Sequence, residues 1–161
     1  MSKTTFTVLR DELKVVMERT FDAPREAVFK AFTDPRAIPQ WWGPRRLTTT
    51  VENMDVRPGG LWRFVQRDAD GNVYAFHGVF KAIDPPKLVS MTFNFEGIPR
   101  DHELVQTLTL EDFGGRTRVR SVATYANLED LDGMVASGME SGATESWERF
   151  AELVETTART G

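Results

Sequence analysis

An acid and a base lie two residues apart at Asp55 and Arg57, directly before Gly59 and Gly60. Side chains two apart in a strand point to the same face of a sheet, so the pair is predicted to share a strand face. Because a guanidinium suits a planar carboxylate, the pair could anchor the polar end of a ligand that is a weak acid. The alternative is an ion pair that shapes the Gly59-Gly60 turn.

The chain has two histidines, His77 and His102, and either could act as a general base. His77 falls in an expected strand, on the face opposite to Phe76, and His102 follows a Pro-containing loop at a strand start. The alternative for each is an ordinary surface or strand histidine. Catalytic residues therefore stay unassigned.

Several other chemistries are excluded by the sequence. It has no cysteine, which removes disulfides, thiolate nucleophiles and cysteine-ligated zinc and fits a reducing cytoplasm. It has no paired-histidine zinc motif, no Gly-x-Ser-x-Gly elbow, no Walker loop and no dinucleotide-binding glycine motif. No metal and no cofactor is expected.

The composition is that of a globular protein. The 161 residues are 40% hydrophobic and 27% charged, and this length suffices for one domain, spanning 1–161, that encloses a core and a cavity. The formal net charge is −4 without a basic stripe, so nucleic acid is not an expected partner. No apolar run is long enough for a membrane span or a secretory signal, so we expect a cytoplasmic protein without membrane insertion, as a monomer or a homodimer.

Hydrophobic periodicity predicts the elements that must position these residues. Residues 1–11 form either a loose leader or an extra edge strand. Alternating patterns and turn residues predict strands over 13–21, 46–55, 60–67, 72–84, 88–95, 103–111 and 117–125. Asp22 is expected to cap a first helix, and Thr33-Asp34-Pro35 to start a short second one that ends at Trp41 and Trp42.

The C-terminal part is predicted to be helical. A shorter helix is expected over 128–137, then a bend or a close contact, then a long amphipathic helix to about 157. Closely spaced strands form an antiparallel sheet, since parallel neighbours would need crossover segments. The prediction is an α+β fold with its core over about 13–157, in which a curved antiparallel sheet wraps round the long helix, with two short helices after the first strand.

The chain is rich in bulky apolar side chains, which either fill the core or line a pocket of the kind that small molecules occupy. They are Met54, Trp62, Phe64, Phe76, Phe80, Met91, Phe93, Phe95, Met139, Trp147 and Phe150. The tandem Trp41 and Trp42 end a helix at Gly43-Pro44, and they could roof a cavity or fill core space. We expect one of them in each role.

The chain contains an ordered set of segments: Phe21-Asp22-Ala23-Pro24 with Val28 and Phe29, Thr33-Asp34-Pro35, Trp41-Trp42-Gly43-Pro44, Asp55-Val56-Arg57-Pro58-Gly59-Gly60, Gly78, Pro85-Pro86-Lys87-Leu88-Val89, Gly115-Arg116-Thr117, Ser137-Gly138-Met139-Glu140-Ser141-Gly142 and Trp147. This set resembles the activator of heat-shock-protein-90 ATPase homologue-like family, a branch of the START-like (SRPBCC, helix-grip, Bet v-like) superfamily. The resemblance implies a helix-grip fold. It also implies a cavity between sheet and helix for lipids, polyketides, plant hormones or hydrophobic metabolites.

Three functions follow as hypotheses. The first is non-enzymatic binding of a small hydrophobic or amphipathic molecule. Its ligand-binding residues would be Trp41, Trp42, Asp55, Arg57, Trp62, Phe64, Phe76, Phe80, Phe93, Met139 and Trp147. The second is a cyclase or dehydratase, in which Asp55 or a histidine acts as acid or base and Arg57 polarises a carbonyl. The third is a stress-linked or chaperone-linked interaction module, which would need an exposed apolar patch.

Overall fold

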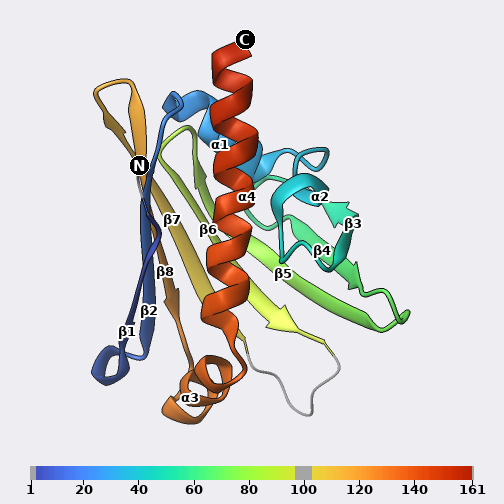
Figure 1. The fold of residues 1–161 in the computed structure, drawn as a ribbon. Helices are drawn as coiled ribbons and strands as arrows, with labels where there is room; N and C mark the ends of the chain where they lie inside the picture. Colours follow the sequence, from blue (N-terminus) through green and yellow to red (C-terminus); the bar gives the residue numbers. More distant parts are fainter. Residues whose placement is uncertain (1–2, 97–102, 161) are drawn as a thin grey trace.

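The computed structural model describes residues 3–96 and 103–160, which form one antiparallel sheet that curves around a long helix (Figure 1). The strands are β1 (Thr5–Leu9), β2 (Lys14–Phe21), β3 (Thr48–Met54), β4 (Leu61–Arg67), β5 (Val73–Asp84), β6 (Leu88–Phe95), β7 (Leu104–Phe113) and β8 (Arg116–Thr124). The helices are η1 (Arg10–Glu12), α1 (Arg25–Thr33), α2 (Ile38–Trp41), α3 (Leu128–Ala136) and α4 (Met139–Thr160). This arrangement confirms the predicted α+β helix-grip fold.

The strand order is β1-β2-β8-β7-β6-β5-β4-β3. Most neighbours follow each other along the chain, and tight turns suffice to join antiparallel neighbours. The turn between β7 and β8 places Gly114 and Gly115 at φ 64° and 86°, a region that glycine enters without strain. The pairing of β2 with β8 joins distant parts of the chain. β1 is the extra edge strand, which was one of two alternatives for residues 1–11.

The start of α1 differs from the prediction that Asp22 caps it. Pro24 occupies the cap position, and no side chain caps this helix. The backbone N–H of Asp22 instead donates to Glu155 Oε2 on α4 at 2.9 Å. The hydroxyl of Thr117 on β8 donates to the carbonyl of Ala23 at 2.8 Å. The segment before α1 is thus held by tertiary contacts with α4 and β8, and a local cap is not needed.

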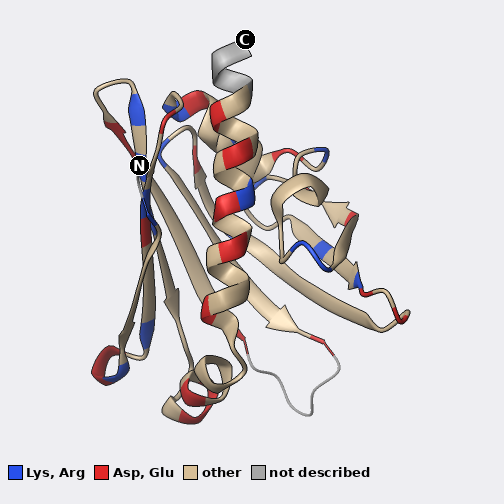
Figure 2. Ribbon diagram, viewed as in Figure 1, with Lys and Arg blue, Asp and Glu red and all other residues tan. Residues whose placement is uncertain are grey.

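A bend separates α3 from α4, as the glycines predicted. The side chain of Asn127 caps α3 by accepting the N–H of Asp130 at 2.8 Å. Gly138 adopts φ 86°, which ends α3 and redirects the chain into α4. The long helix then crosses the concave side of the sheet and carries acidic and basic residues along its outward side (Figure 2).

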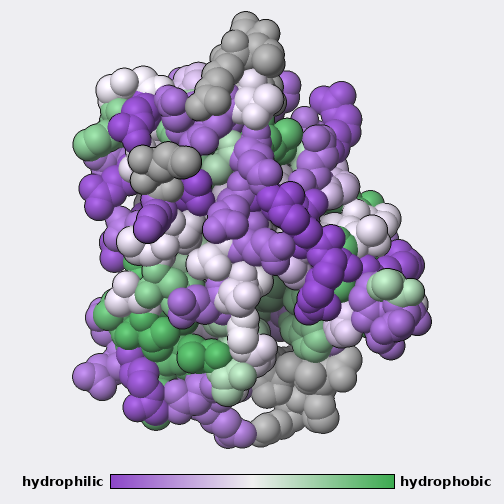
Figure 3. Space-filling view, viewed as in Figure 1, coloured by the Kyte–Doolittle hydropathy of each residue, from purple (hydrophilic) through white to green (hydrophobic). Residues whose placement is uncertain are grey.

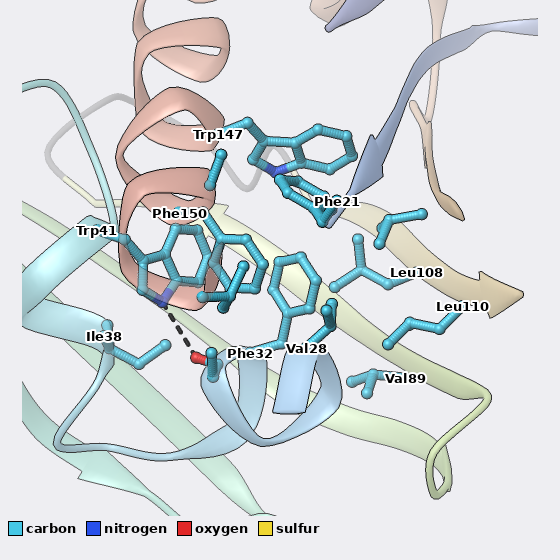
Figure 4. Packing of buried hydrophobic residues seen from close by; sticks show 14 of the residues in the cluster. Phe21, Val28, Phe32, Ile38, Trp41, Val89, Leu108, Leu110, Trp147 and Phe150 are labelled. Carbon is cyan, nitrogen blue, oxygen red and sulfur yellow. Dashed lines mark hydrogen bonds between the residues drawn. The ribbon is translucent and has the colours of Figure 1, made fainter. Parts of the chain in front are cut away.

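Aromatic side chains hold α4 to the rest of the molecule (Figure 4). Phe150 on α4 stacks on Phe32 of α1 with ring centroids 4.1 Å apart and meets the edge of Phe21 at 5.0 Å. Trp41 contacts Phe150 at 4.8 Å, and its indole N–H donates to the carbonyl of Ala31 at 3.1 Å. This contact gives a buried indole the partner that its N–H needs, and it fixes α2 against α1.

Candidate ligand-binding site

A cavity of about 750 Å³ lies between α4 and the concave face of the sheet. Its lining is mainly apolar and comes from both short helices, both C-terminal helices and most strands. All four tryptophans of the chain line it, as does every methionine among the described residues. Methionine side chains are flexible and adapt to irregular shapes, so this lining can accommodate ligands of several outlines.

One wall of the cavity is a group of packed aromatic rings. Trp42 meets Phe64 and Phe76 edge-on, with centroids 5.1 and 5.0 Å apart. Trp62 lies 4.7 Å from Phe64 and 5.5 Å from Phe93. Rings in such tilted and edge-on contacts hold each other in place, which favours a wall that exists before a ligand arrives.

Gly78 on β5 makes room for Trp62. A Cβ atom at this position would collide with the carbonyl oxygen of Thr92 and would lie 2.6 Å from the Trp62 indole nitrogen. The indole N–H donates to that same carbonyl of Thr92 at 3.2 Å. The absence of a side chain at position 78 therefore lets the indole pack closely against β5 and β6.

Hydrogen bonds from α4 and β3 hold the segment that carries Trp42. The hydroxyl of Thr49 donates to the carbonyl of Trp42 at 2.8 Å. The backbone N–H of Gly43 donates to the hydroxyl of Ser146 at 3.0 Å. Arg149 donates to the carbonyls of Gly43 at 2.8 Å and Gln40 at 2.9 Å. Trp42 is thus positioned by side chains that bind its own backbone and the backbone of Gln40 and Gly43.

Inside the apolar lining, a few polar side chains are placed by alternation along the strands. Gln106 Nε2 on β7 donates to the hydroxyl of Ser121 on β8 at 3.0 Å. Gln66 on β4, only 4% exposed, donates to the hydroxyl of Thr49 at 3.3 Å. Tyr125 lies against Met139 Sδ at 3.5 Å, and burial raises the pKa of its phenol to about 12.

The sequence reasoning missed these polar residues, although a signal was present. Leu104 and Leu108 lie two residues before and after Gln106, and both are buried. Inward-facing leucines on either side place the amide on the same inner face. The same alternation places Ser121 between Val119 and Ala123, so strand periodicity could have identified both residues.

The cavity opens beside α3. Among the described lining residues, the exposed ones are Glu129, Gly133 and Ser137, which belong to α3 or directly follow it. In the space-filling view, hydrophobic side chains reach the surface near α3 and the first turns of α4, whereas the outward side of α4 is hydrophilic (Figure 3). Of the described lining, the part on and directly after α3 is therefore the most exposed to solvent.

Most of the predicted ligand-binding residues line this cavity, but two do not. Those that line it are Trp41, Trp42, Trp62, Phe64, Phe76, Phe80, Phe93, Met139 and Trp147. Trp41 is 5% exposed and belongs to the core, whereas Trp42 is half-buried in the aromatic wall. The tertiary structure therefore brings together side chains from α2, β4, β5, β6 and α4.

The structure corrects the prediction that Asp55 and Arg57 share a strand face. β3 ends at Met54, so the two residues lie in a turn and share no strand face. The Arg57 guanidinium is exposed and donates to Asp55 Oδ2 at 2.6 Å, while Gly60 N–H donates to the carbonyl of Arg57 at 2.8 Å. Neither residue lines the cavity. The alternative interpretation, an ion pair that shapes the Gly59-Gly60 turn, fits this geometry better.

His77 does not line the cavity. His77 is exposed on the outer face of the sheet, where its Nδ1 lies 2.9 Å from Glu96 Oε2. Arg63 also binds Glu96, through two nitrogens at 2.9 Å, and these contacts lower the pKa of the Glu96 carboxyl to about 2. His102 lies outside the described residues.

The described residues meet neither the requirements of a metal site nor those of a membrane-spanning helix. No three histidine, aspartate or glutamate side chains of residues 3–96 and 103–160 gather as metal ligands. In the same part of the chain, no helix has both the length and the apolar character needed to cross a bilayer.

Comparison with known families and solved structures agrees with the fold. Residues 22–155 match the model of the family described as activator of Hsp90 ATPase homolog 1-like protein (AHSA1). The chain belongs to the AHSA1 family. The AHSA1 family is a branch of the SRPBCC superfamily, so the resemblance drawn from the sequence is confirmed. No curated protein matches the chain in sequence.

Solved structures share the AHSA1 fold over nearly the whole chain. A protein from Mycobacterium smegmatis is 26% identical with a TM-score of 0.84, covering 94% of this chain and 96% of its own. One from Arthrobacter aurescens is 25% identical with a TM-score of 0.88, covering 94% and 91%. The AHSA1 protein from Silicibacter pomeroyi is 23% identical with a TM-score of 0.76, covering 89% and 99%, and supports the fold alone.

Proposed function

We propose that this AHSA1 protein binds a small hydrophobic or amphipathic molecule in the cavity and acts as a binding protein rather than an enzyme. The observation that carries the proposal is the cavity itself, about 750 Å³ in volume and lined by aromatic and methionine side chains. Sites for small molecules commonly have volumes of roughly 300–1,000 Å³ and such a lining. SRPBCC proteins typically bind hydrophobic ligands, which supports the same function.

The placement of the acid and base candidates that the structure describes favours binding over catalysis. Asp55 and Arg57 form an ion pair in a turn, and His77 faces outward from the sheet. A general acid or base must come within hydrogen-bond reach of the reacting atoms. These three side chains therefore offer no support for a cyclase or dehydratase in the cavity.

An interaction module is supported less well. The large hydrophobic side chains that are exposed among the described residues are spread over four elements: Leu61 on β4, Val73 on β5, Phe113 on β7, and Leu128 and Val135 on α3. A docking surface would gather apolar side chains in one contiguous patch. In this chain the larger gathering of apolar side chains is the cavity lining.

The test is titration with N-phenylnaphthylamine, a neutral apolar dye whose emission increases in apolar surroundings. Because all four tryptophans line the cavity, bound dye should quench tryptophan emission by energy transfer. We expect saturable binding in the micromolar range. An absence of saturable binding to the folded protein would contradict the proposal.

A matched pair of variants locates the binding. Ala143 on α4 lines the cavity, so Ala143→Phe should occupy the space and weaken dye binding at least about tenfold. Ala82 is exposed on β5, so Ala82→Phe adds the same ring outside the cavity and should leave the affinity unchanged. Equal effects of the two substitutions would place the dye elsewhere.

A further inference from the structure

We infer that the cavity selects ligands whose polar end is uncharged, a hydroxyl, carbonyl or amide that hydrogen-bonds to Gln106 and Ser121. This inference rests on the proposed function, and it names the chemical class of the ligand. It replaces the weak acid that an Asp55–Arg57 anchor would have favoured, because that ion pair lies outside the cavity.

The first step is the charge of the lining. Among the lining residues that the structure describes there is no lysine, arginine or histidine. The charged ones are Glu129 and Asp130, which are acidic and lie on α3 at the opening. A carboxylate that enters an apolar cavity loses its hydration, and the described lining offers no cation to offset that loss. The described lining therefore disfavours anionic ligands.

The second step is the hydrogen-bonding capacity of the inner face. Ser121 is 3% exposed, and its hydroxyl accepts a hydrogen bond from Gln106 Nε2 at 3.0 Å. Within the described ranges, no donor forms a hydrogen bond to Gln106 Oε1. The amide thus keeps an acceptor and a second N–H, and the serine keeps its own proton.

The third step joins these two. A neutral polar group can both donate to and accept from the amide–hydroxyl pair, so its own hydrogen bonds to water are replaced on binding. A ligand with no polar group would fill the cavity but leave Gln106 without this partner. The combination of an apolar lining, no described cation and one polar pair on β7 and β8 is suited to neutral amphipathic molecules.

The experiment compares three ligands of the same chain length as competitors of N-phenylnaphthylamine at neutral pH: decanol, decanoate and decane. We expect decanol to displace the dye at a concentration at least about tenfold below that of decanoate, and below that of decane. Decanoate as effective as decanol would overturn the inference while dye binding still supports the proposed function. Failure of the dye itself to bind would overturn both.

Variants of Gln106 test the polar pair. Gln106→Leu should weaken decanol about threefold to tenfold and leave decane unaffected. Gln106→Arg places a permanent cation in the cavity and should strengthen decanoate at least about tenfold relative to decanol. Thr109→Val, on the exposed side of the same strand, is the control and should change neither ratio.

An unchanged preference in Gln106→Leu would overturn the role of the pair. If Gln106→Arg does not fold, the comparison of decanol with decanoate on the natural chain and on Gln106→Leu remains decisive. Near-ultraviolet circular dichroism of each variant establishes folding before the ligands are compared.

Discussion

The hydroxyl of Ser146 on α4 donates to the backbone carbonyl of Trp41 at 3.1 Å. The same oxygen accepts the N–H of Gly43 at 3.0 Å, so one buried side chain serves both ends of a short segment. The two hydrogen bonds join Ser146 to residues more than a hundred positions away in the chain. They position Trp42, which lies between Trp41 and Gly43, at the cavity.

Ser146→Ala should lower the free energy of unfolding by about 1–2 kcal/mol, because the Gly43 N–H loses its buried acceptor. Urea denaturation measures this change. Ser141→Ala, at an exposed position of the same helix, is the control for helix propensity and should be neutral or slightly stabilising. Equal effects of the two substitutions would argue against a role for the Ser146 contact.

Gly78→Ala should destabilise the protein by at least about 2 kcal/mol, since the added methyl group meets the Thr92 carbonyl and the Trp62 indole. The near-ultraviolet circular dichroism of the tryptophans should also change. Gly142→Ala is the matched control: a Cβ atom there meets nothing within 4 Å, and in α4 it should stabilise by up to about 1 kcal/mol. A tolerated Gly78→Ala would contradict the close approach.

Alkaline pH should destabilise the protein through Tyr125. Burial raises the pKa of this phenol from 10.0 to about 12 in the folded protein. Between these values the unfolded chain loses the proton while the folded protein keeps it, so stability is present below pH 10 and is lost as the pH rises toward 12. Denaturant midpoints measured across this range should fall.

The variant Tyr125→Phe isolates this contribution. Its free energy of unfolding should fall less steeply between pH 10 and 12, because the phenol with the raised pKa is absent. In a pH titration of the natural chain, part of the tyrosinate absorbance should appear only as the pH approaches 12. Tyr125→Phe should remove that part. A variant with the same pH dependence as the natural chain would contradict the burial effect.

Acid pH should destabilise the protein through Glu96 on the outer face of the sheet. Hydrogen bonds from Arg63 lower the pKa of its carboxyl from 4.5 to about 2. The stabilisation is present above pH 4.5 and is lost as the pH falls toward 2, because the unfolded chain takes up the proton first. Glu96→Gln should show a flatter dependence in this window, as should Arg63→Met. If both variants match the natural chain, the ion pair contributes nothing measurable.

The predicted strands and helices agree with the structure because their signals are local. Alternation predicted β6 at 88–95, and the glycine at 138 predicted the break between α3 and α4. The local signal failed at Asp22, because Glu155 binds Asp22 and Thr117 binds Ala23, and both partners lie on elements more than ninety residues away.

What the sequence determined by itself is the family, the order of the elements and the apolar side chains that gather in the cavity. Periodicity decides which face of a strand or helix is apolar, and this information is carried by neighbouring residues. The tertiary structure decided which polar groups enter the cavity. Asp55 and Arg57 lie outside the cavity because β3 ends at Met54, before both residues. Gln106 lies beside Ser121 because β7 pairs with β8, and that pairing joins side chains that no local pattern brings together.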